Sequence, residues 1–386
     1  MIGRRTLIGF AMAVTAVTVA RSGHELPIYP SYYPHEIELL SVAPERAAEL
    51  LLAGKIQAYV GPAPRFAAPP PATIDSIESL GSFVIVRVNP SSRLIKEGRS
   101  ACAVAEAVMR DLVRKSDAWV FHPYPVTPFH GDYLHHVDLA EAAKASILGD
   151  RPDLTGSDLQ ALKVTAGSEF ARSLLSPERL AQGSPADAEV TEVAAAELVA
   201  SSGFAINGWL SPAWLRVGWH HAALLLSDWT GEDERRRRIE ADLKRLRVLD
   251  YDNPVERINL ERSLVTALAG GCRTRVAGYT VKREYFSTVF TAGIENIAYD
   301  SLTGFNSPIF IRTVKLKDFP WNGWLALGID RRPAAAWNPI AGFTDDFGRL
   351  MWSAVGDPAS IPSPNDSAWI LNRIADVAST ATPPSR

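Results

Sequence analysis

The sequence predicts an α/β protein, with a layered α/β part over residues 23–230 and a mixed α+β part over residues 231–386. Two observations carry this prediction. Up to about residue 230, short apolar runs typical of strands alternate with segments whose apolar residues recur every three or four positions, as in helices. Beyond residue 230, two consecutive helical patterns are followed by aromatic-rich, strand-like stretches. A chain of 386 residues is long enough for two domains.

Residues 1–22 are typical of a secretory signal peptide. Arg4 and Arg5 precede an uncharged run over residues 6–20, and Ala20 and Ser22 supply the small residues of a cleavage site. Because the run is too short to span a bilayer, we expect it to be removed rather than retained as an anchor. The sequence therefore predicts a secreted, periplasmic protein with no membrane span after cleavage.

The clearest local pattern covers residues 44–60. Pro44 suits the first turn of a helix, and Gly54 suits its end in the left-handed conformation. Alternation over residues 56–60 predicts a strand directly afterwards. The apolar run over residues 83–88 then predicts a central strand, and Ser100 is a predicted helix cap.

Later elements follow from the same rules. Asp138 with Glu141 predicts the capped start of a short helix, and the recurrence of Val190, Ala194 and Leu198 predicts another helix. Residues 232–247 form a charged amphipathic helix pattern, and a further helix is expected between Asn253-Pro254 and Gly270-Gly271. Strands are expected over residues 276–281 and 308–314.

The charge balance argues against a nucleic-acid partner. The formal net charge is -3, with 22% charged and 47% hydrophobic residues, which is ordinary for a globular protein. The four consecutive arginines over residues 235–238 have acidic neighbours on both sides. This run is therefore interpreted as a solvated helix face.

The two cysteines, Cys102 and Cys272, leave two alternatives open. In an oxidising compartment they can form one disulfide closing a loop of about 170 residues, which the chain-entropy model values at about 4 to 5 kcal/mol. The other alternative is two separate buried thiols. Without a CxxC motif, thioredoxin-type exchange is not predicted.

Half of the eight histidines lie within residues 122–136. His122, His130 and His135 are the candidate ligands for a divalent metal, because neutral imidazole is a common ligand for zinc and copper. The alternative is a set of hydrogen-bonded or surface histidines. The spacing matches no established metal motif, and the adjacent His135 and His136 should project in different directions.

A second candidate site lies near the C-terminal part. If residues 309–317 form a strand, Lys315 and Lys317 share a face. Together with Trp321, Asn322 and Trp324 they are a predicted binding site for an anionic or planar ligand. The alternative is an edge strand protected by lysines, with the tryptophans in the core.

The stretch over residues 47–61, a helix ending at Gly54 followed by a short strand ending at Gly61, resembles the helix-to-strand segment of the periplasmic solute-binding proteins of transport systems. The resemblance covers about fifteen residues. It implies that Tyr59 and Gly61 lie near the ligand, and that the protein acts in transport or sensing rather than catalysis. The aromatic region after residue 272 departs from that family's pattern.

The chain has no GxSxG, GxGxxG, GxxxxGK[ST] or HExxH motif, so the sequence leaves enzyme status open and favours a non-enzyme. The first hypothesis is an exported periplasmic binding or accessory protein for a small-molecule ligand. The alternatives are an exported metal-dependent enzyme using residues 122–136 and a periplasmic partner-binding protein. A divalent metal is the one cofactor considered. A membrane permease or another periplasmic protein is the expected macromolecular partner.

Overall fold

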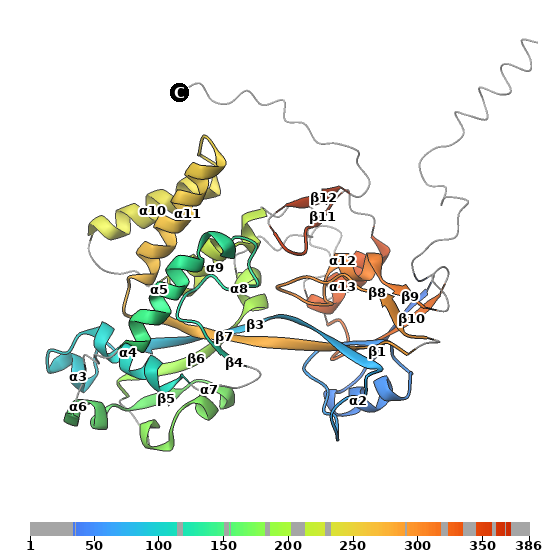
Figure 1. Cartoon of the computed structure of the whole chain (residues 1–386), viewed down its shortest axis with the longest axis horizontal. Helices are drawn as coiled ribbons and strands as arrows, with labels where there is room; N and C mark the ends of the chain where they lie inside the picture. Colours follow the sequence, from blue (N-terminus) through green and yellow to red (C-terminus); the bar gives the residue numbers. More distant parts are fainter. Residues whose placement is uncertain are drawn as a thin grey trace, which may run out of the picture.

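The computed structural model describes residues 34, 36–113, 119–149, 154, 156–181, 186–201, 213–227, 233–289, 292–317, 323–334, 345–356, 360–366 and 368–371. The predicted signal peptide lies outside these residues, as do Trp321 and Asn322 of the predicted ligand site. The α/β prediction is confirmed, because helices cover a large mixed sheet (Figure 1).

The central sheet has eight strands in the order β1-β10-β2-β7-β3-β6-β5, with β4 pairing on β7. The β1–β10, β10–β2 and β5–β6 pairs are parallel, and the other pairs are antiparallel. Two small sheets join β8 to β9 and β11 to β12. The strands are β1 Glu36–Ser41, β2 Ala58–Val60, β3 Ile74–Val88, β4 Trp119–Phe121, β5 Val164–Ala166, β6 Ala188–Ala194, β7 Thr274–Ser287, β8 Ile294–Asn296, β9 Lys315–Leu316, β10 Trp324–Ile329, β11 Ser360–Pro362 and β12 Trp369–Leu371.

The long strands β3 and β7 run antiparallel from one side of the molecule to the other, from the Ile74/Ser287 pair to the Arg87/Thr274 pair (Figure 1). They connect two lobes. The first lobe comprises the described residues of 36–77 and 285–371, and the second those of 80–276. Each lobe has its own hydrophobic clusters. The division at residue 230 predicted from the sequence stays a prediction.

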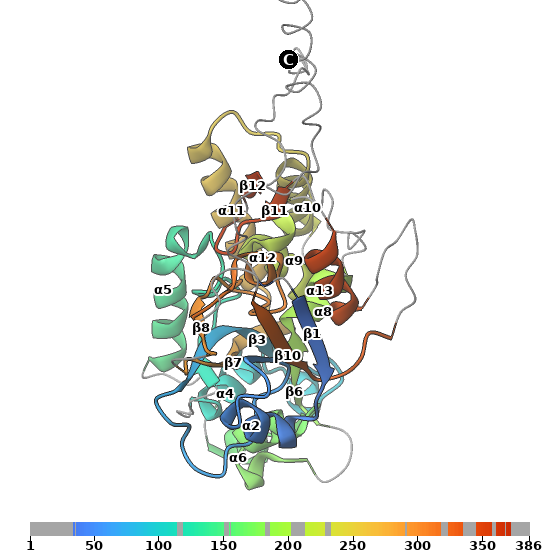
Figure 2. The same ribbon diagram turned by 90° about the vertical axis from the view of Figure 1, so that its right-hand side faces the viewer.

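The first lobe carries β1 and β10 side by side, with α2 nearby (Figure 2). In the second lobe, residues 83–86 are buried on both faces of the sheet, as predicted for a central strand, whereas Arg87 is exposed. Phe83 and Ile85 enter the cluster beneath α9, α10 and α11, whereas Val84 and Val86 enter the cluster beneath α4. Because successive side chains on a strand alternate in direction, a continuous apolar run is what such a position requires.

The helix start and stop signals agree with the structure. Pro44 opens α2, and Gly54 follows it with φ +64°. The Ser100 side chain accepts the Ala103 N–H at 3.1 Å, and the Asn253 side chain accepts the Glu256 N–H at 3.0 Å. The helices are α2 Pro44–Leu52, α3 Arg93–Lys96, α4 Ala101–Asp111, α5 Val137–Leu148, α6 Gly156–Ala161, α7 Glu169–Leu174, α8 Ala195–Ser201, α9 Gly218–Leu225, α10 Asp233–Arg247, α11 Pro254–Ala269, α12 Pro308–Thr313 and α13 Asp346–Val355, with 3₁₀ turns η1 Tyr133–His135, η2 Pro177–Arg179 and η3 Ala213–Arg216.

Two predicted elements are wrong. The helix stripe through Val190, Ala194 and Leu198 is instead strand β6 followed by α8, because β6 pairs with β3 along seven residues and with β5 on its other edge. The predicted strand over residues 308–314 is helix α12, which begins at Pro308 and leaves only Lys315–Leu316 as strand.

One predicted cap is also wrong. His136, rather than Asp138, precedes the first residue of α5. The Asp138 carboxylate instead accepts two hydrogen bonds from the Arg262 guanidinium, at 2.7 and 2.6 Å. A bidentate arginine is a stronger partner than a backbone N–H, so a contact made by α11 decides where this side chain points.

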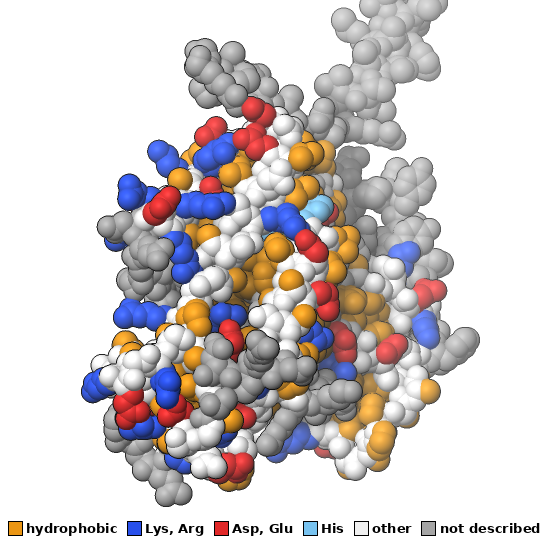
Figure 3. Space-filling view, turned by 60° about the vertical axis from the view of Figure 1, so that its left-hand side comes forward, with side chains coloured by type: hydrophobic (Ala, Val, Ile, Leu, Met, Phe, Trp, Pro, Cys, Tyr) orange, Lys and Arg blue, Asp and Glu red, His pale blue; other side chains and the backbone are white. Residues whose placement is uncertain are grey.

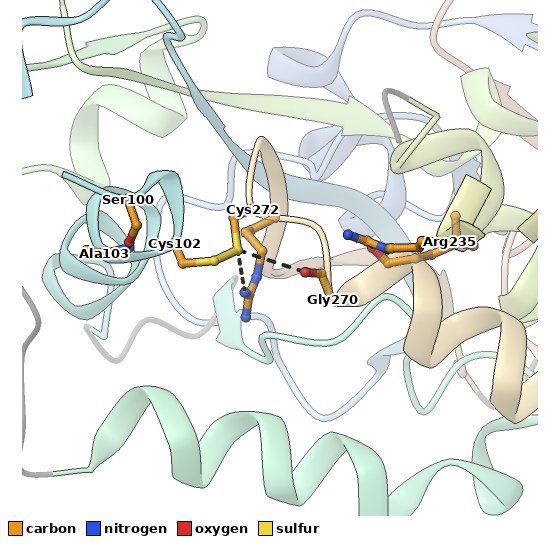
Figure 4. Close-up of a disulfide and its surroundings, with 8 residues drawn as sticks. Ser100, Cys102, Ala103, Arg235, Gly270 and Cys272 are labelled. Atoms are coloured by element: carbon orange, nitrogen blue, oxygen red, sulfur yellow. Dashed lines mark hydrogen bonds between the residues drawn. A yellow bond between two sulfur atoms is a disulfide. The ribbon is translucent and has the colours of Figure 1, made fainter. Parts of the chain in front are cut away.

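Cys102 and Cys272 form a disulfide between the first turn of α4 and the residues just before β7 (Figure 4). Their Cα atoms are 4.7 Å apart and 170 residues separate them in the sequence. Of the two alternatives for the cysteines, a disulfide or two separate thiols, the structure has the disulfide. By the chain-entropy model this cross-link stabilises the fold by about 4 to 5 kcal/mol.

The charged amphipathic helix predicted over residues 232–247 is α10, which packs on α11 through Ile239, Leu243 and Leu246. Arg235 donates to the carbonyls of Ala267 and Leu268 at the end of α11, where a cation is favoured by the helix dipole. Basic and acidic side chains are interspersed on the face shown in Figure 3. Among the described helices, none combines the length and apolar character needed to cross a membrane.

Candidate functional site

The most polar part of the interior lies in the second lobe, where residues 122–136 pack against α9 and α11. Buried polar groups need partners, because an unpaired one costs about 1 to 3 kcal/mol. We therefore distinguish structural from reactive groups by whether each buried polar atom has a hydrogen-bond partner. The buried polar residues of this region are His122, Thr127, His130, Asp132, His136, His220, His221 and Glu261.

His130 and His221 form a hydrogen-bonded pair whose protons can be assigned. The Thr127 N–H donates to His130 Nδ1 at 3.0 Å, so Nδ1 carries no proton. In a neutral ring the proton then sits on Nε2, which donates to His221 Nδ1 at 2.9 Å. His221 in turn uses its Nε2–H to donate to the Leu215 carbonyl at 3.1 Å. All four ring nitrogens are therefore occupied.

The environment of this pair keeps it neutral. Burial lowers the pKa of His130 to about 3 and lowers the pKa of His221 well below its ordinary value. Phe83 packs against both imidazoles, with ring centroids 6.1 and 6.3 Å away. The unprotonated nitrogen of each ring, Nδ1, already accepts a hydrogen bond from an N–H group. A proton added there would lie against that donor. The pair joins the 122–136 segment to α9 and is structural.

Asp132 holds the start of α9. Its carboxylate accepts the Gly218 N–H at 2.9 Å and the Trp219 N–H at 3.3 Å. These are the first N–H groups of the helix, which have no partner within it. Burial raises the pKa of the Asp132 carboxyl, while the bond from Gly218 opposes that shift.

Around Asp132, polar atoms without partners appear. His136 Nδ1 lies 2.9 Å from the Tyr124 hydroxyl, but its buried Nε2 has no hydrogen-bond partner. Glu261 on α11 has one oxygen 3.8 Å from Arg257 Nε, and its other oxygen has no partner. Burial, reinforced by the Asp132 charge, raises the pKa of Glu261 to about 7. Glu261 can therefore exchange a proton near neutral pH.

His220 is a second unsatisfied group. It is 1% exposed, and neither ring nitrogen has a hydrogen-bond partner. Its ring packs against Trp214 and Trp219, with centroids 4.7 and 5.7 Å away. Burial lowers its pKa to about 3, so the ring is neutral in this aromatic setting. Packing rather than hydrogen bonding holds it.

The predicted metal ligands His122, His130 and His135 are not brought together as a metal site. Within the part of the chain that the structure describes, no group of three or more His, Cys, Asp or Glu residues is arranged to hold an ion. His122 Nε2 lies 2.8 Å from the Val126 carbonyl, and both nitrogens of His130 are occupied. In the described structure, His122 and His130 form hydrogen bonds within the protein instead, and metal binding by these residues stays a prediction.

The described residues of the predicted ligand sites lie in the first lobe, on or next to β2, β9 and β10. Tyr59 is buried in the first lobe and donates to the Val42 carbonyl at 3.1 Å, with Gly61 against its ring. Trp324 is 73% exposed at the start of β10. Lys317 donates to the Thr288 carbonyl at 2.7 Å, and Lys315 lies in β9. Trp321 and Asn322 fall outside the described residues. Whether any of these contacts a ligand stays a prediction.

Glu261 was missed from the sequence, although a signal exists. It lies three, four and seven residues before Leu264, Val265 and Leu268, which places a carboxylate on the buried stripe of its helix. The pairing of His221 with His130, 91 residues away, could not be read from spacing.

The two lobes also touch away from β3 and β7. Arg216 of η3 in the second lobe forms an ion pair with Asp300 of the first lobe, whose side chain is 3% exposed. Gly131 lies so close to the β11–β12 loop that a Cβ there would be 2.6 Å from the Asn365 carbonyl oxygen. Leu302 of the first lobe packs into the core cluster of the second. Polar groups therefore lie where the lobes meet.

Comparison with known proteins gives structural similarities only. No family model matches the chain, and no curated protein sequence matches it. The fold is similar to NikZ from Campylobacter jejuni in complex with Ni(L-His), at 13% identity and TM-score 0.32, covering 66% of this chain and 56% of that one. It is also similar to the oligopeptide-binding protein AppA from Bacillus subtilis in complex with a nonapeptide, at 14% identity and TM-score 0.39, covering 71% and 59%.

A third similar structure is NikA from Brucella suis in complex with Fe(III)-EDTA, at 12% identity and TM-score 0.35, covering 66% of this chain and 57% of that one. The chain thus spans less than two thirds of the length of these structures. At TM-scores below 0.5, these similarities assign neither a family nor a ligand to this chain.

Proposed function

We propose that the chain is an exported, periplasmic binding protein that holds a small molecule where its two lobes meet. The supporting observation is the architecture. Two lobes, each with its own hydrophobic clusters, are linked by β3 and β7 and also contact each other through Leu302 and through polar groups such as Arg216 and Asp300. Interfaces between such units are preferred positions for small-molecule sites.

The Arg216–Asp300 pair is the proposed ligand-sensing contact. The Asp300 carboxylate also accepts the N–H groups of Leu302 and Thr303, at 2.8 and 3.0 Å, so it is held in place by its own loop. Arg216 is the more exposed partner, with a side chain 19% accessible. A guanidinium offers five donors, so it can bind a carboxylate or carbonyl group of a ligand while facing Asp300.

Binding is favoured over catalysis by the state of the buried histidines. His130 and His221 are neutral, and every ring nitrogen bonds to the protein, so neither is available as a general base. Export rests on the predicted signal peptide. A membrane permease, or another periplasmic protein, is the proposed partner that would receive the ligand-loaded form.

The test is a thermal-shift screen of the mature protein against amino acids, short peptides, sugars and metal chelates. A ligand at one hundred times its dissociation constant should add about 2.7 kcal/mol of stability, which shifts the melting temperature measurably. For the ligand found, Asp300→Asn should weaken binding. The matched control Glu78→Gln, which breaks the exposed Arg283–Glu78 pair on β3 and β7, should not. Absence of any stabilising ligand, or equal affinity in the two variants, would reject the proposal.

A further inference from the structure

Glu261 occupies a position that an ionised carboxylate should not occupy. It lies on the buried stripe of α11 with Leu264, Val265 and Leu268, and its side chain is 4% accessible. One of its two oxygens has no hydrogen-bond partner. A buried charge needs several strong partners to offset its lost hydration, and this group has few.

The groups around Glu261 do not supply that compensation. On α11 itself, Arg257 is 3.8 Å away and 35% accessible, so its charge is partly screened by solvent. The segment before η1 contributes Asp132, a second buried carboxyl whose charge opposes ionisation of Glu261. Asp132 in turn lies near His136, which burial keeps neutral.

Within the described residues, Arg257 is the cation that forms an ion pair with Glu261. Helix α9 contributes His220 and His221, both neutral. Helix α10 contributes Asp242 and Arg238, but both bond to the Ser263 hydroxyl of α11. The loop between α10 and α11 contributes the Tyr251 phenol, whose own pKa burial raises. Protonation of Glu261 is the remaining way to remove the cost of its charge.

We propose that Glu261 carries a proton in the folded protein at neutral pH, and that loss of this proton as the pH rises loosens the packing of the α10–α11 hairpin against α9. The hairpin is defined by residues 233–269 and projects from the second lobe (Figure 1). This protonation of Glu261 is independent of the proposed ligand site, because it involves neither Arg216 nor Asp300.

The direction of the effect follows from linkage. The pKa of Glu261 is raised from 4.5 to about 7 in the folded state. The stability that this group contributes is therefore fully present below pH 4.5 and is lost as the pH rises through 7. Between pH 5.5 and 8.5, its titration should raise the unfolding equilibrium constant about 30-fold.

The test compares wild type with Glu261→Gln, a neutral side chain of the same shape, by denaturant unfolding at pH 5.5 and 8.5. The ratio of the wild-type unfolding constant to that of the variant should rise about 30-fold between pH 5.5 and pH 8.5, because the variant lacks the titrating carboxyl. The matched control is Glu240→Gln on the exposed face of α10, which should follow wild type at both pH values. A ratio that does not change with pH would overturn the proposal.

A second measurement needs no folded variant. Infrared spectra of the wild-type protein should show a protonated-carboxyl band that is present at pH 5.5 and lost by pH 8.5. Hydrogen exchange, corrected for its intrinsic pH dependence, should show protection in α11 decreasing over the same range while protection in β3 is retained. An unprotonated carboxylate throughout, or equal loss of protection in both elements, would contradict the inference.

Discussion

The His130–His221 pair and the surroundings of Glu261 lie in the same core cluster, yet they differ in how their polar atoms are paired. In the pair, the chain of donors and acceptors runs without a gap from the Thr127 N–H to the Leu215 carbonyl. Around Glu261, a carboxylate oxygen and the Nε2 of His136 have no partner. Although both regions are buried, the His130–His221 pair is fully hydrogen-bonded, whereas Glu261 is a titratable group.

The two regions should respond to pH in opposite directions. The histidines have lowered pKa values, so their contribution to stability is present above pH 6.5 and is lost in acid. Glu261 has a raised pKa, so its contribution is lost as the pH rises. Maximum stability is expected between these limits, near pH 6 to 7 by the same linkage argument.

The largest expected effect is acid destabilisation. Between pH 7.5 and 5, keeping His130 neutral should by itself cost about 2 kcal/mol of unfolding free energy, roughly 1.4 kcal/mol per pH unit below pH 6.5, and His221 adds a further loss in the same direction. The measurement is the unfolding free energy from denaturant titrations at pH 7.5, 6 and 5. A free energy that is flat across this range would show that the pair does not control acid stability.

Breaking the paired region directly should have the next largest effect. His221→Phe keeps a planar ring but leaves the His130 Nε2–H and the Leu215 carbonyl without partners. We expect a loss of about 3 kcal/mol, from two buried polar groups left unsatisfied. Thermal and denaturant unfolding at pH 7.5 measure it. A loss below about 1 kcal/mol would mean that water replaces the missing bonds.

The smallest effect, and the sharpest control, comes from the neighbouring residue in α9. His220→Phe removes two ring nitrogens that have no partner and keeps the contacts with Trp214 and Trp219. It should leave stability unchanged or raise it by about 1 kcal/mol. A loss as large as that of His221→Phe would show that pairing does not distinguish these two histidines.

Local signals predicted the elements whose boundaries are set by nearby residues. Pro44 and Gly54 bound α2, and Asn253 caps α11, because caps and turns are satisfied within a few residues. The predictions that failed are those decided by distant partners. The Val190 stripe became a strand through its pairing with β3, about one hundred residues away in the sequence.

The candidate site shows the same division. The sequence singled out residues 122–136 as unusually rich in histidine, and the structure places them in a buried polar cluster. It did not identify their partners, because His221 and Glu261 come from two later helices. The histidine-rich segment, whose composition suggests a metal site, instead forms a hydrogen bond from His130 to His221 of α9 in the described structure.

By itself, the sequence determined the α/β class, the ends of α2 and α11, and the availability of two cysteines for one bridge. These depend on backbone preferences and on residue types that act locally. Tertiary structure alone decided that β3 pairs with β7, that His130 bonds to His221, and that Glu261 lies close enough to Asp132 for their charges to interact. Those outcomes depend on which distant surfaces exclude water together, and burial then sets the protonation of every group enclosed between them.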